Sequence, residues 1–551
     1  MHTPIFRAFT RALQRARQEN RRAEGSAPPV SAASRRWSRR RFLGTTLRAA
    51  AVAGAGGALG GLEAALRGLD GDGAARAASG APALEGARIA VIGGGLAGLS
   101  AAYRLQSLGF APTVYEARAG VGGRIRSVRG PVGDDLLVEL GAELVDSTHD
   151  DIVALTRELG LSLYPRASTG SEVPDTAYIF DGRAWSEEEV AEALRPLAAA
   201  IASDAARLDP DTDGSVARFD GTTAAAYLDA HAPAGSQPFV RVLVENAIRA
   251  ELGVEPEETS ALHLLFLLPT VDGEAVDMLG ASDEAYVLAG GSSVLTDALA
   301  ERLTGRIRLR TALRAVEPHG AAYRLRFEDG AEAVADQVIL ALPFAVLRHV
   351  ALQVALPEGL RRMIETLDSG ANEKIIAGFR SRPWRRAGGF RQEAWADLGF
   401  TEMWDATLRQ PDRREGAMTF FLGGAQVAAM RAGTARERGR ELVDRVDRVL
   451  PGWREAAADR WVRTTWGESR FSRGAYSTFR PGQYTAFAPF LWFEPEDPSE
   501  LREVRAGNLH FAGEHLSGDF YGFMNGAAQT GRLAAQAVAR GVAVGSGAGR
   551  T

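Results

Sequence analysis

The chain has no cysteine among its 551 residues, so it can form no disulfide bond and offers no thiolate metal ligand, thiol nucleophile or cysteinyl link to a cofactor. Lysine is almost as scarce, because Lys374 is the only lysine among 64 basic residues. The eight histidines lack the short spacing of metal ligands, and we therefore expect no bound metal ion. Long hydrophobic runs are also absent. The apolar run Leu262–Leu268 is too short to span a bilayer and predicts a buried helix.

The net charge of -5 conceals two oppositely charged regions. Residues 1–77 contain 14 arginines against 5 acidic residues, about +9, which leaves about -14 for the remainder. An acidic body argues against nucleic-acid binding and mildly favours cationic substrates.

Residues 1–77 are predicted to form a disordered leader, because they are rich in Arg, Ala and Ser and lack sustained apolar periodicity. Within them, three arginines at 39–41 precede a weakly hydrophobic Ala/Gly run and a small-residue site at 75–77. This pattern resembles a twin-arginine signal peptide, which implies export through the twin-arginine translocon to the periplasm or the exterior. The alternatives are a basic tail or an uncleaved anchor, although Arg48 interrupts the apolar run.

A glycine-rich turn organises the rest of the chain. The apolar run Ile89–Ile92 breaks into Gly93, Gly95 and Gly98, and an Ala- and Leu-rich stretch continues to Leu105. A strand, then glycines, then a helix predict a dinucleotide-binding turn, with the helix N-terminus facing a pyrophosphate. The motif alone also fits an ordinary turn.

Two further features favour nucleotide binding. A second apolar run ends at Glu116, 23 residues after Gly93, where a carboxylate can bind ribose hydroxyls. Beyond it, Arg118, Gly123 and Arg124 offer positive charge and a close backbone approach to phosphates. An ordinary surface turn does not need both features.

The pattern of strands and helices predicts an α/β fold class, or α+β overall, in which a Rossmann-like dinucleotide-binding domain is interleaved with a mixed-sheet and helical substrate domain. The first domain is expected to comprise residues 87–150, 285–345 and 500–540, and the second residues 151–284 and 346–499. Residues 541–551 are expected to be a flexible tail.

A helical lobe is predicted within the substrate domain. Alanine and leucine recur at helix spacing over Ser186–Ile201 and Ser236–Leu252. Ser186 and Glu189 have the spacing of a capping box, which supports a helix start at this point.

Two candidates for chemistry lie outside the glycine-rich turn. Lys374 is the only ammonium in a chain whose other side-chain cations are all guanidinium groups, which suggests a place that needs a compact cation. The alternative is an ordinary lysine in a biased composition. The second candidate is Glu514, at the end of a predicted strand and ahead of a helix that opens near Met524. The free N–H groups of such a helix start could stabilise an electron-rich, reduced cofactor.

Together these motifs resemble the FAD-dependent amine oxidase family, which includes monoamine, polyamine and L-amino-acid oxidases. The resemblance covers roughly residues 87–540. It rests on the following motifs in this sequence: Gly93-x-Gly95-x-x-Gly98, Glu116-Ala-Arg118, Gly122-Gly123-Arg124, Lys374 with Pro383-Trp384, Trp466 with Gly474-Ala475-Tyr476, and Gly513-Glu514 with Gly522-Phe523-Met524-x-Gly526-Ala527.

The resemblance implies that the Rossmann-like domain binds FAD. It assigns the adenosine ribose to Glu116 and the ribityl and flavin portions to Glu514 and Met524. Ala475 stands where some members attach the flavin through cysteine, so the FAD should be non-covalent. The full set of implied cofactor-binding residues is Gly93, Gly95, Gly98, Glu116, Arg118, Gly123, Arg124, Gly141, Ala142, Glu514 and Met524.

The resemblance also implies catalytic roles for three residues. Lys374 matches the lysine that contacts flavin N5 through water, and Tyr476 and Phe523 match two aromatic residues that sandwich the amine. Phe523 replaces the more usual tyrosine. Glu143 and Trp466 are candidate substrate contacts, and Glu143 could receive a second cationic group of a diamine or a basic amino acid.

The implied reaction is hydride transfer from an amine to flavin N5. The resulting imine is hydrolysed to a carbonyl and ammonia or a smaller amine, and dioxygen is reduced to hydrogen peroxide. The sequence leaves open whether the electron acceptor is O2 or another molecule and whether the protein forms a homo-oligomer. The runner-up is an L-amino-acid oxidase, although Gly141 is followed by Ala142 and Glu143 where such enzymes often place a carboxylate-binding arginine. A carotenoid-type desaturase and a non-enzymatic flavoprotein are further alternatives.

Overall fold

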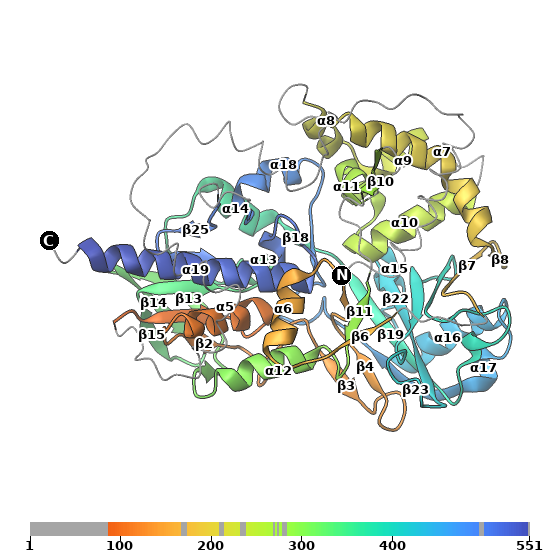
Figure 1. The fold of residues 1–551 in the computed structure, drawn as a ribbon, viewed down its shortest axis with the longest axis horizontal. Coiled ribbons are helices and arrows are strands. Elements are labelled where there is room, and N and C mark those ends of the chain that lie inside the picture. Colours follow the sequence, from red (N-terminus) through yellow and green to blue (C-terminus); the bar gives the residue numbers. More distant parts are fainter. Residues whose placement is uncertain are drawn as a thin grey trace.

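The computed structural model describes residues 86–166, 173–208, 214–231, 238–267, 270–272, 275–277, 284–494 and 501–548. The predicted leader, and with it the twin-arginine segment, lies outside the described residues. The described chain combines helices with parallel and antiparallel strands (Figure 1), which confirms the predicted α/β fold class.

A six-stranded sheet carries the glycine-rich turn at its centre. Its strand β1 (Ile89–Ile92) is buried throughout and pairs in parallel with β2 and β16. The sheet order is β12-β2-β1-β16-β26-β25, and β25 alone runs antiparallel to its neighbour. Segments far apart in the sequence therefore form one sheet. The other strands are β2 (Thr113–Tyr115), β12 (Ile307–Arg308), β16 (Gln337–Leu340), β25 (Arg505–Ala506) and β26 (Leu509–Phe511).

Two helices from opposite ends of the described chain pack side by side on this sheet. Helix α5 (Leu96–Ser107) follows β1, and α19 (Met524–Ala548) lies along it (Figure 1). A Cβ atom at Gly531 would lie 2.3 Å from the Ala97 carbonyl oxygen, so the two backbones touch here. Helix α19 extends to Ala548, past the residue 541 at which the sequence placed the start of a flexible tail.

A seven-stranded sheet of order β23-β19-β22-β21-β20-β7-β8 forms the centre of the second region. Strands β19 (Asn372–Phe379) and β22 (Gly416–Gly423) are buried at every residue. One face packs on an apolar core under helices α16 (Ala435–Asp447) and α17 (Trp453–Ala456). The remaining strands are β7 (Thr176–Phe180), β8 (Arg183–Trp185), β20 (Glu393–Ala396), β21 (Glu402–Asp405) and β23 (Ala457–Arg463).

The predicted helical lobe is present and lies together in yellow and green in Figure 1. Ser186 caps its first helix as predicted, because its hydroxyl accepts from the Glu189 amide while the Glu189 carboxylate accepts from the Ser186 amide at 2.7 Å. The apolar helix at Ala261–Leu267 is buried from residue 261 to 265, as predicted. The lobe comprises α7 (Glu187–Ala206), α8 (Ser215–Gly221), α9 (Ala224–His231), α10 (Pro238–Leu252) and α11 (Ala261–Leu267).

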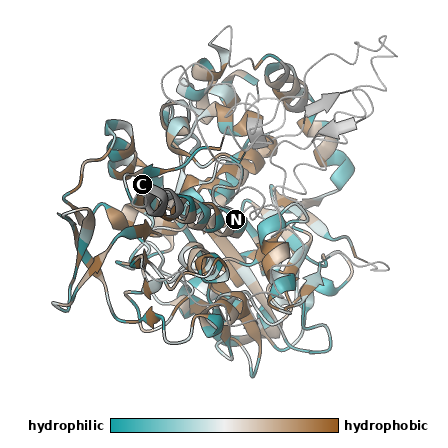
Figure 2. Cartoon of the chain, turned by 60° about the vertical axis from the view of Figure 1, so that its left-hand side comes forward, coloured by the Kyte–Doolittle hydropathy of each residue, from teal (hydrophilic) through white to brown (hydrophobic). Residues whose placement is uncertain are grey.

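Smaller sheets and short helices join the two regions, and Figure 2 shows hydrophobic colouring along the strands in the interior. Within the described ranges, no helix is both long and apolar enough to cross a membrane. The additional strands are β3 (Ser127–Arg129), β4 (Leu137–Glu139), β5 (Leu144–Val145), β6 (Leu163–Pro165), β9 (Thr270–Asp272), β10 (Ala275–Asp277), β11 (Tyr286–Leu288), β13 (Leu313–His319), β14 (Ala322–Phe327), β15 (Glu332–Ala335), β17 (Ala351–Leu352), β18 (Asp368–Ser369) and β24 (Ser477–Thr478). The additional α-helices are α6 (Asp150–Glu158), α12 (Ser293–Arg302), α13 (Phe344–Leu347), α14 (Glu358–Thr366), α15 (Ala425–Ala429) and α18 (Gln483–Phe487).

Candidate active site

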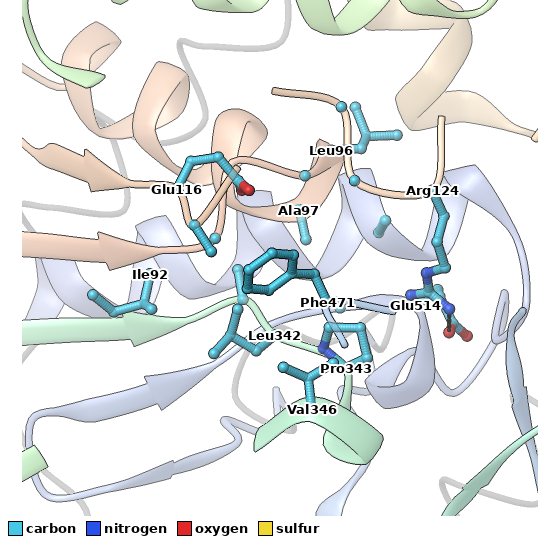
Figure 3. Close-up of a pocket in the computed structure, with 18 of the residues that line it drawn as sticks. Ile92, Leu96, Ala97, Glu116, Arg124, Leu342, Pro343, Val346, Phe471 and Glu514 are labelled. Carbon is cyan, nitrogen blue, oxygen red and sulfur yellow. Dashed lines mark hydrogen bonds and ion pairs between the residues drawn. The ribbon is translucent and has the colours of Figure 1, made fainter. Parts of the chain in front are cut away.

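A cavity of about 250 Å³ opens where β1 meets α5, and we call it the large cavity. Figure 3 shows part of its lining, with Phe471 lying near Leu342 and Pro343. The cavity brings together most of the residues that the sequence singled out. These are Gly93, Gly95, Glu116, Arg118, Gly123, Arg124, Ala142, Tyr476, Glu514, Phe523 and Met524.

The three glycines of the turn have different structural roles. Gly93 has φ +109°, and a Cβ atom there would lie 2.6 Å from the Ala341 carbonyl oxygen. A Cβ atom at Gly98 would lie 1.9 Å from the Gly93 carbonyl oxygen, so Gly98 lets the helix approach the strand. At Gly95 a Cβ atom would meet only Gly123 Cα, at 3.8 Å. Gly95 therefore keeps open space at the wall of the cavity.

Glu116 lies at the end of β2 and is oriented by the backbone. Its carboxylate accepts hydrogen bonds from the Gly94 amide at 2.7 Å and from the Arg118 amide at 2.8 Å. Each carboxylate oxygen retains a further lone pair for a ligand hydroxyl. Arg118 donates from Nη1 to the Gly123 carbonyl oxygen at 3.0 Å, while its buried Nε has no hydrogen-bond partner among the described residues.

Arg124 and Glu514 form an ion pair across the cavity, with Nη1 and Oε1 2.8 Å apart (Figure 3). Burial alone would raise the pKa of Glu514, but Arg124 and hydrogen bonds from Ser477 and the Gly522 amide lower the pKa to about 2. The carboxylate is therefore ionised at neutral pH. It joins the strand end at β26 to the loop that precedes α19.

His515 lines the same cavity, and the sequence reasoning missed it. Its ring packs edge-on against Phe344, with centroids 4.3 Å apart, and neither ring nitrogen has a hydrogen-bond partner in the described part of the chain. Burial lowers the pKa of His515 to about 4, so the ring is neutral at neutral pH. Its place directly after Glu514, in a chain with only eight histidines, was the available signal.

A second cavity of about 20 Å³ adjoins the large one, and we call it the small cavity. Arg124 and Tyr476 line both. Lys374 lines the small cavity from β19, together with Gly141 and Trp466. The structure thus brings the only lysine into a small cavity that shares Arg124 and Tyr476 with the large one.

The Lys374 ammonium is 2% exposed and is surrounded by acceptors. It donates to the carbonyl oxygens of Gly141 at 2.9 Å and Glu139 at 3.1 Å, and to Glu143 Oε2 at 3.2 Å. It also lies 5.0 Å from the ring centroid of Trp404. Trp466 donates from Nε1 to the Leu140 carbonyl oxygen at 3.1 Å.

The sequence suggested that Glu143 contacts the substrate, whereas in the structure its carboxylate contacts Lys374 and Trp404. Its side chain is 4% exposed and is not part of the described lining of either cavity. Glu143 Oε2 accepts from Lys374 Nζ and from Trp404 Nε1, each at 3.2 Å. Burying a carboxylate is costly unless a nearby cation compensates its charge. Lys374 is the cation that contacts Glu143.

Tyr476 and Phe523 both line the large cavity. The Tyr476 hydroxyl donates to the Ala250 carbonyl oxygen of α10, and burial raises the pKa of this phenol well above its usual range. Phe523 packs edge-on against His149, with centroids 4.9 Å apart. The two rings therefore offer a neutral, mostly apolar surface at the cavity. Their sandwich arrangement around an amine stays a prediction.

A family model described as flavin containing amine oxidoreductase matches residues 96–539. The chain belongs to this family. It is 25% identical over 456 residues to a flavin-containing amine oxidase of Danio rerio, which covers 80% of this chain and 83% of that protein. It is 23% identical over 469 residues to an L-amino acid dehydrogenase of Synechocystis, covering 80% and 92% respectively. Cyclohexylamine oxidase from Brevibacterium oxydans shares the fold, with a TM-score of 0.68, 21% identity and coverage of 83% and 99%.

The protein is therefore a flavin-containing amine oxidoreductase, and the residues that line its large cavity fit FAD. Space is open beside Gly95, and helices α5 and α19 both begin at the cavity, where their free N–H groups favour negative charge on a ligand. Polar atoms of Arg118 and His515 are buried without hydrogen-bond partners among the described residues, as a polar ligand would require. Glu116, Arg118 and Arg124 would hold the nucleotide portion, and Glu514 and Met524 the ribityl and flavin portions.

Proposed function

We propose that this flavin amine oxidoreductase oxidises an unprotonated amine held between Tyr476 and Phe523. FAD supplies the hydride acceptor, and O2 reoxidises it to give hydrogen peroxide. The observation that supports this most is the convergence of Lys374, Tyr476 and the cofactor-side residues on two adjoining cavities. The imine product would be hydrolysed by water to a carbonyl compound and ammonia or a smaller amine.

The residues of the chain contribute orientation and desolvation. Tyr476 keeps its proton and fixes its ring by donating to Ala250, while Phe523 adds an apolar side chain. A neutral, water-poor wall favours the unprotonated amine, because burial disfavours the charged form. Lys374 contributes a fixed ammonium in the adjoining small cavity, where positive charge can stabilise an electron-rich flavin.

We also propose that FAD binds without a covalent bond. Ala475 lines the large cavity, and its carbonyl oxygen accepts from Arg124. A methyl side chain cannot form the thioether that a cysteine could. Acid precipitation tests this point: the flavin should remain in the supernatant, and a yellow pellet would contradict it.

An amine without a carboxylate is favoured over an amino acid. Two deeply buried arginines of the substrate region already have carboxylate partners, because Arg166 pairs with Glu284 at 2.8 Å and Arg409 pairs with Glu139 at 2.7 Å. A substrate carboxylate would have to compete with these ion pairs. The L-amino acid dehydrogenase relative keeps amino acids as the second candidate. Because Glu143 binds Lys374, it no longer supports a second cationic group on the substrate.

The proposed location follows from the leader. Its twin arginines and small-residue site support export by the twin-arginine route to the periplasm or the exterior, a route that carries folded, cofactor-loaded proteins. N-terminal sequencing of the exported protein should find a start after residue 77. A cytoplasmic protein that begins at Met1 would contradict the proposal.

Anaerobic mixing tests the reaction itself. The FAD-loaded protein is mixed with a panel of primary amines, diamines and amino acids while the flavin absorbance is recorded. We expect at least one amine to bleach the flavin, and readmission of air to restore the colour with formation of peroxide. Bleaching by amino acids alone would favour the second candidate, and no bleaching by any compound would overturn the oxidase proposal.

A further inference from the structure

The ammonium of Lys374 has three N–H donors, and the protein supplies three acceptors for them. Two are backbone carbonyl oxygens, of Glu139 and Gly141, and the third is the Glu143 carboxylate. The sequence predicts that Lys374 contacts the flavin through water, which needs one of these donors. Glu143 is the one side chain among the three acceptors, so it is the acceptor that a substitution can remove.

Glu143 comes from a different part of the chain than Lys374 and is itself oriented. It lies between β4 and β5, whereas Lys374 lies on β19. Trp404 of β21 donates from Nε1 to the same oxygen that accepts from Lys374. Both charged side chains are almost fully buried, so their attraction is little screened by solvent.

We propose that Glu143 is a positioning residue that fixes the ammonium of Lys374 in the small cavity. This inference rests on the proposed function of Lys374 at the flavin. Without the Glu143 carboxylate, the ammonium loses its nearest anion and its one side-chain acceptor, so it is no longer held in a single position.

Other charged and titratable groups face Lys374 from the neighbouring elements. Arg124 and Tyr476 line the small cavity with it. Glu139 lies on β4 and is paired with Arg409. Glu402 on β21 stands in register with Phe421, which pairs with Lys374 across β19 and β22. Glu143 differs from all of them because its carboxylate contacts the ammonium directly.

The sole lysine makes a direct test available, because lysine labelled with carbon-13 at the ε position gives one labelled side chain in the full chain. The Lys374 signal of the FAD-loaded protein is recorded at neutral pH in wild type, Glu143→Gln and Glu143→Asp. Glu415→Gln, at an exposed acid, is the control. We expect the signal to move and broaden in Glu143→Gln, because the ammonium is no longer fixed, and to change much less in Glu143→Asp, which keeps the charge.

A second readout follows flavin reoxidation after photoreduction, which needs no amine substrate. In Glu143→Gln, the rate should be lower than in wild type. In a Lys374→Met background, Glu143→Gln should add no further change, because its effect passes through the lysine. An unchanged Lys374 signal in Glu143→Gln, or a full additional rate change without the lysine, would overturn the inference. Failure of amines to bleach the flavin would instead refute the proposed function and leave the lysine signal readable.

Discussion

The six-stranded and seven-stranded sheets supply the active site in different ways. On the six-stranded sheet, Gly93 to Gly98 and Glu116 act through backbone geometry and neighbouring amides within one stretch of chain. On the seven-stranded sheet, Lys374 depends on Glu143, more than 200 residues away in sequence. The cofactor side is thus built from local motifs, whereas the lysine site is built from long-range pairs. Substitutions can test separately the local motifs of the cofactor side and the long-range pairs of the lysine site.

The largest effect is expected at Gly95, which leaves open space at the wall of the large cavity on the cofactor side. Gly95→Val would fill the wall of the large cavity while meeting little protein, so the chain should fold but bind FAD at least about 100-fold more weakly, or not at all. Flavin content after purification and FAD titration measure this. Gly120→Val is the matched control, because a Cβ atom there meets nothing within 4 Å and its φ is not positive. Full FAD content in Gly95→Val would contradict the proposed position of the diphosphate beside Gly95.

The next effect tests the long-range pair. Lys374→Met should give a folded, yellow protein whose turnover or reoxidation is slower by about 10-fold or more, because the fixed charge is lost. It should also lower the free energy of unfolding by about 3 kcal/mol, since Glu143 is left buried without its cation. Stopped-flow reoxidation and denaturant unfolding measure the two losses.

The double variant Lys374→Met with Glu143→Gln provides the control for that experiment. It should regain part of the stability but none of the rate, because the buried charge is gone while the ammonium is still missing. Wild-type kinetics in Lys374→Met would contradict the role of the lysine.

An acid-dependent loss of stability is expected on the six-stranded sheet. Burial lowers the pKa of His510 on β26 to about 4 from its ordinary value of 6.5. The unfolded chain therefore binds this proton more readily, and stability falls as the pH drops from 6.5 toward 4, by up to about 3 kcal/mol. Thermal unfolding across this range should show a smaller decline in His510→Gln, which can keep a contact with Gln337. Identical declines in both proteins would contradict the assignment.

The smallest effect is expected at a purely local feature in the helical lobe. Ser186→Ala removes the hydroxyl that caps α7 and should cost about 1 kcal/mol, with unchanged flavin content and amine bleaching. Ser186→Thr retains a hydroxyl and should recover most of the loss. A change in flavin content would show that the helical lobe affects FAD binding, which would contradict the separation between the two regions.

Local motifs were predictable from the sequence because their chemistry is contained in a few adjacent residues. The glycine turn, the capping box at Ser186 and the helix near Met524 all carry such signals, and their elements stand where expected. Strand β13 was missed, because Arg, Glu and His interrupt its apolar pattern and its pairing with β14 supplies the missing support. Pairing across the sheet is a tertiary property.

The partners of the predicted site residues were harder to foresee. The composition drew attention to Lys374 and the family resemblance to Glu143, but nothing local indicates that strand β19 brings one against the other. His515 escaped notice because its place directly after Glu514 was its one sequence signal, and the cavity that its unpartnered ring lines exists only after folding. Substrate preference is equally a property of the assembled site.

A crystal structure of the FAD-loaded protein tests the central claim most directly. The account predicts flavin density in the large cavity, with the diphosphate beside Gly95, the ring system near Tyr476 and Phe523, and Lys374 within reach of the flavin through one water. A flavin bound elsewhere, or a ring system remote from the Lys374 ammonium, would contradict it.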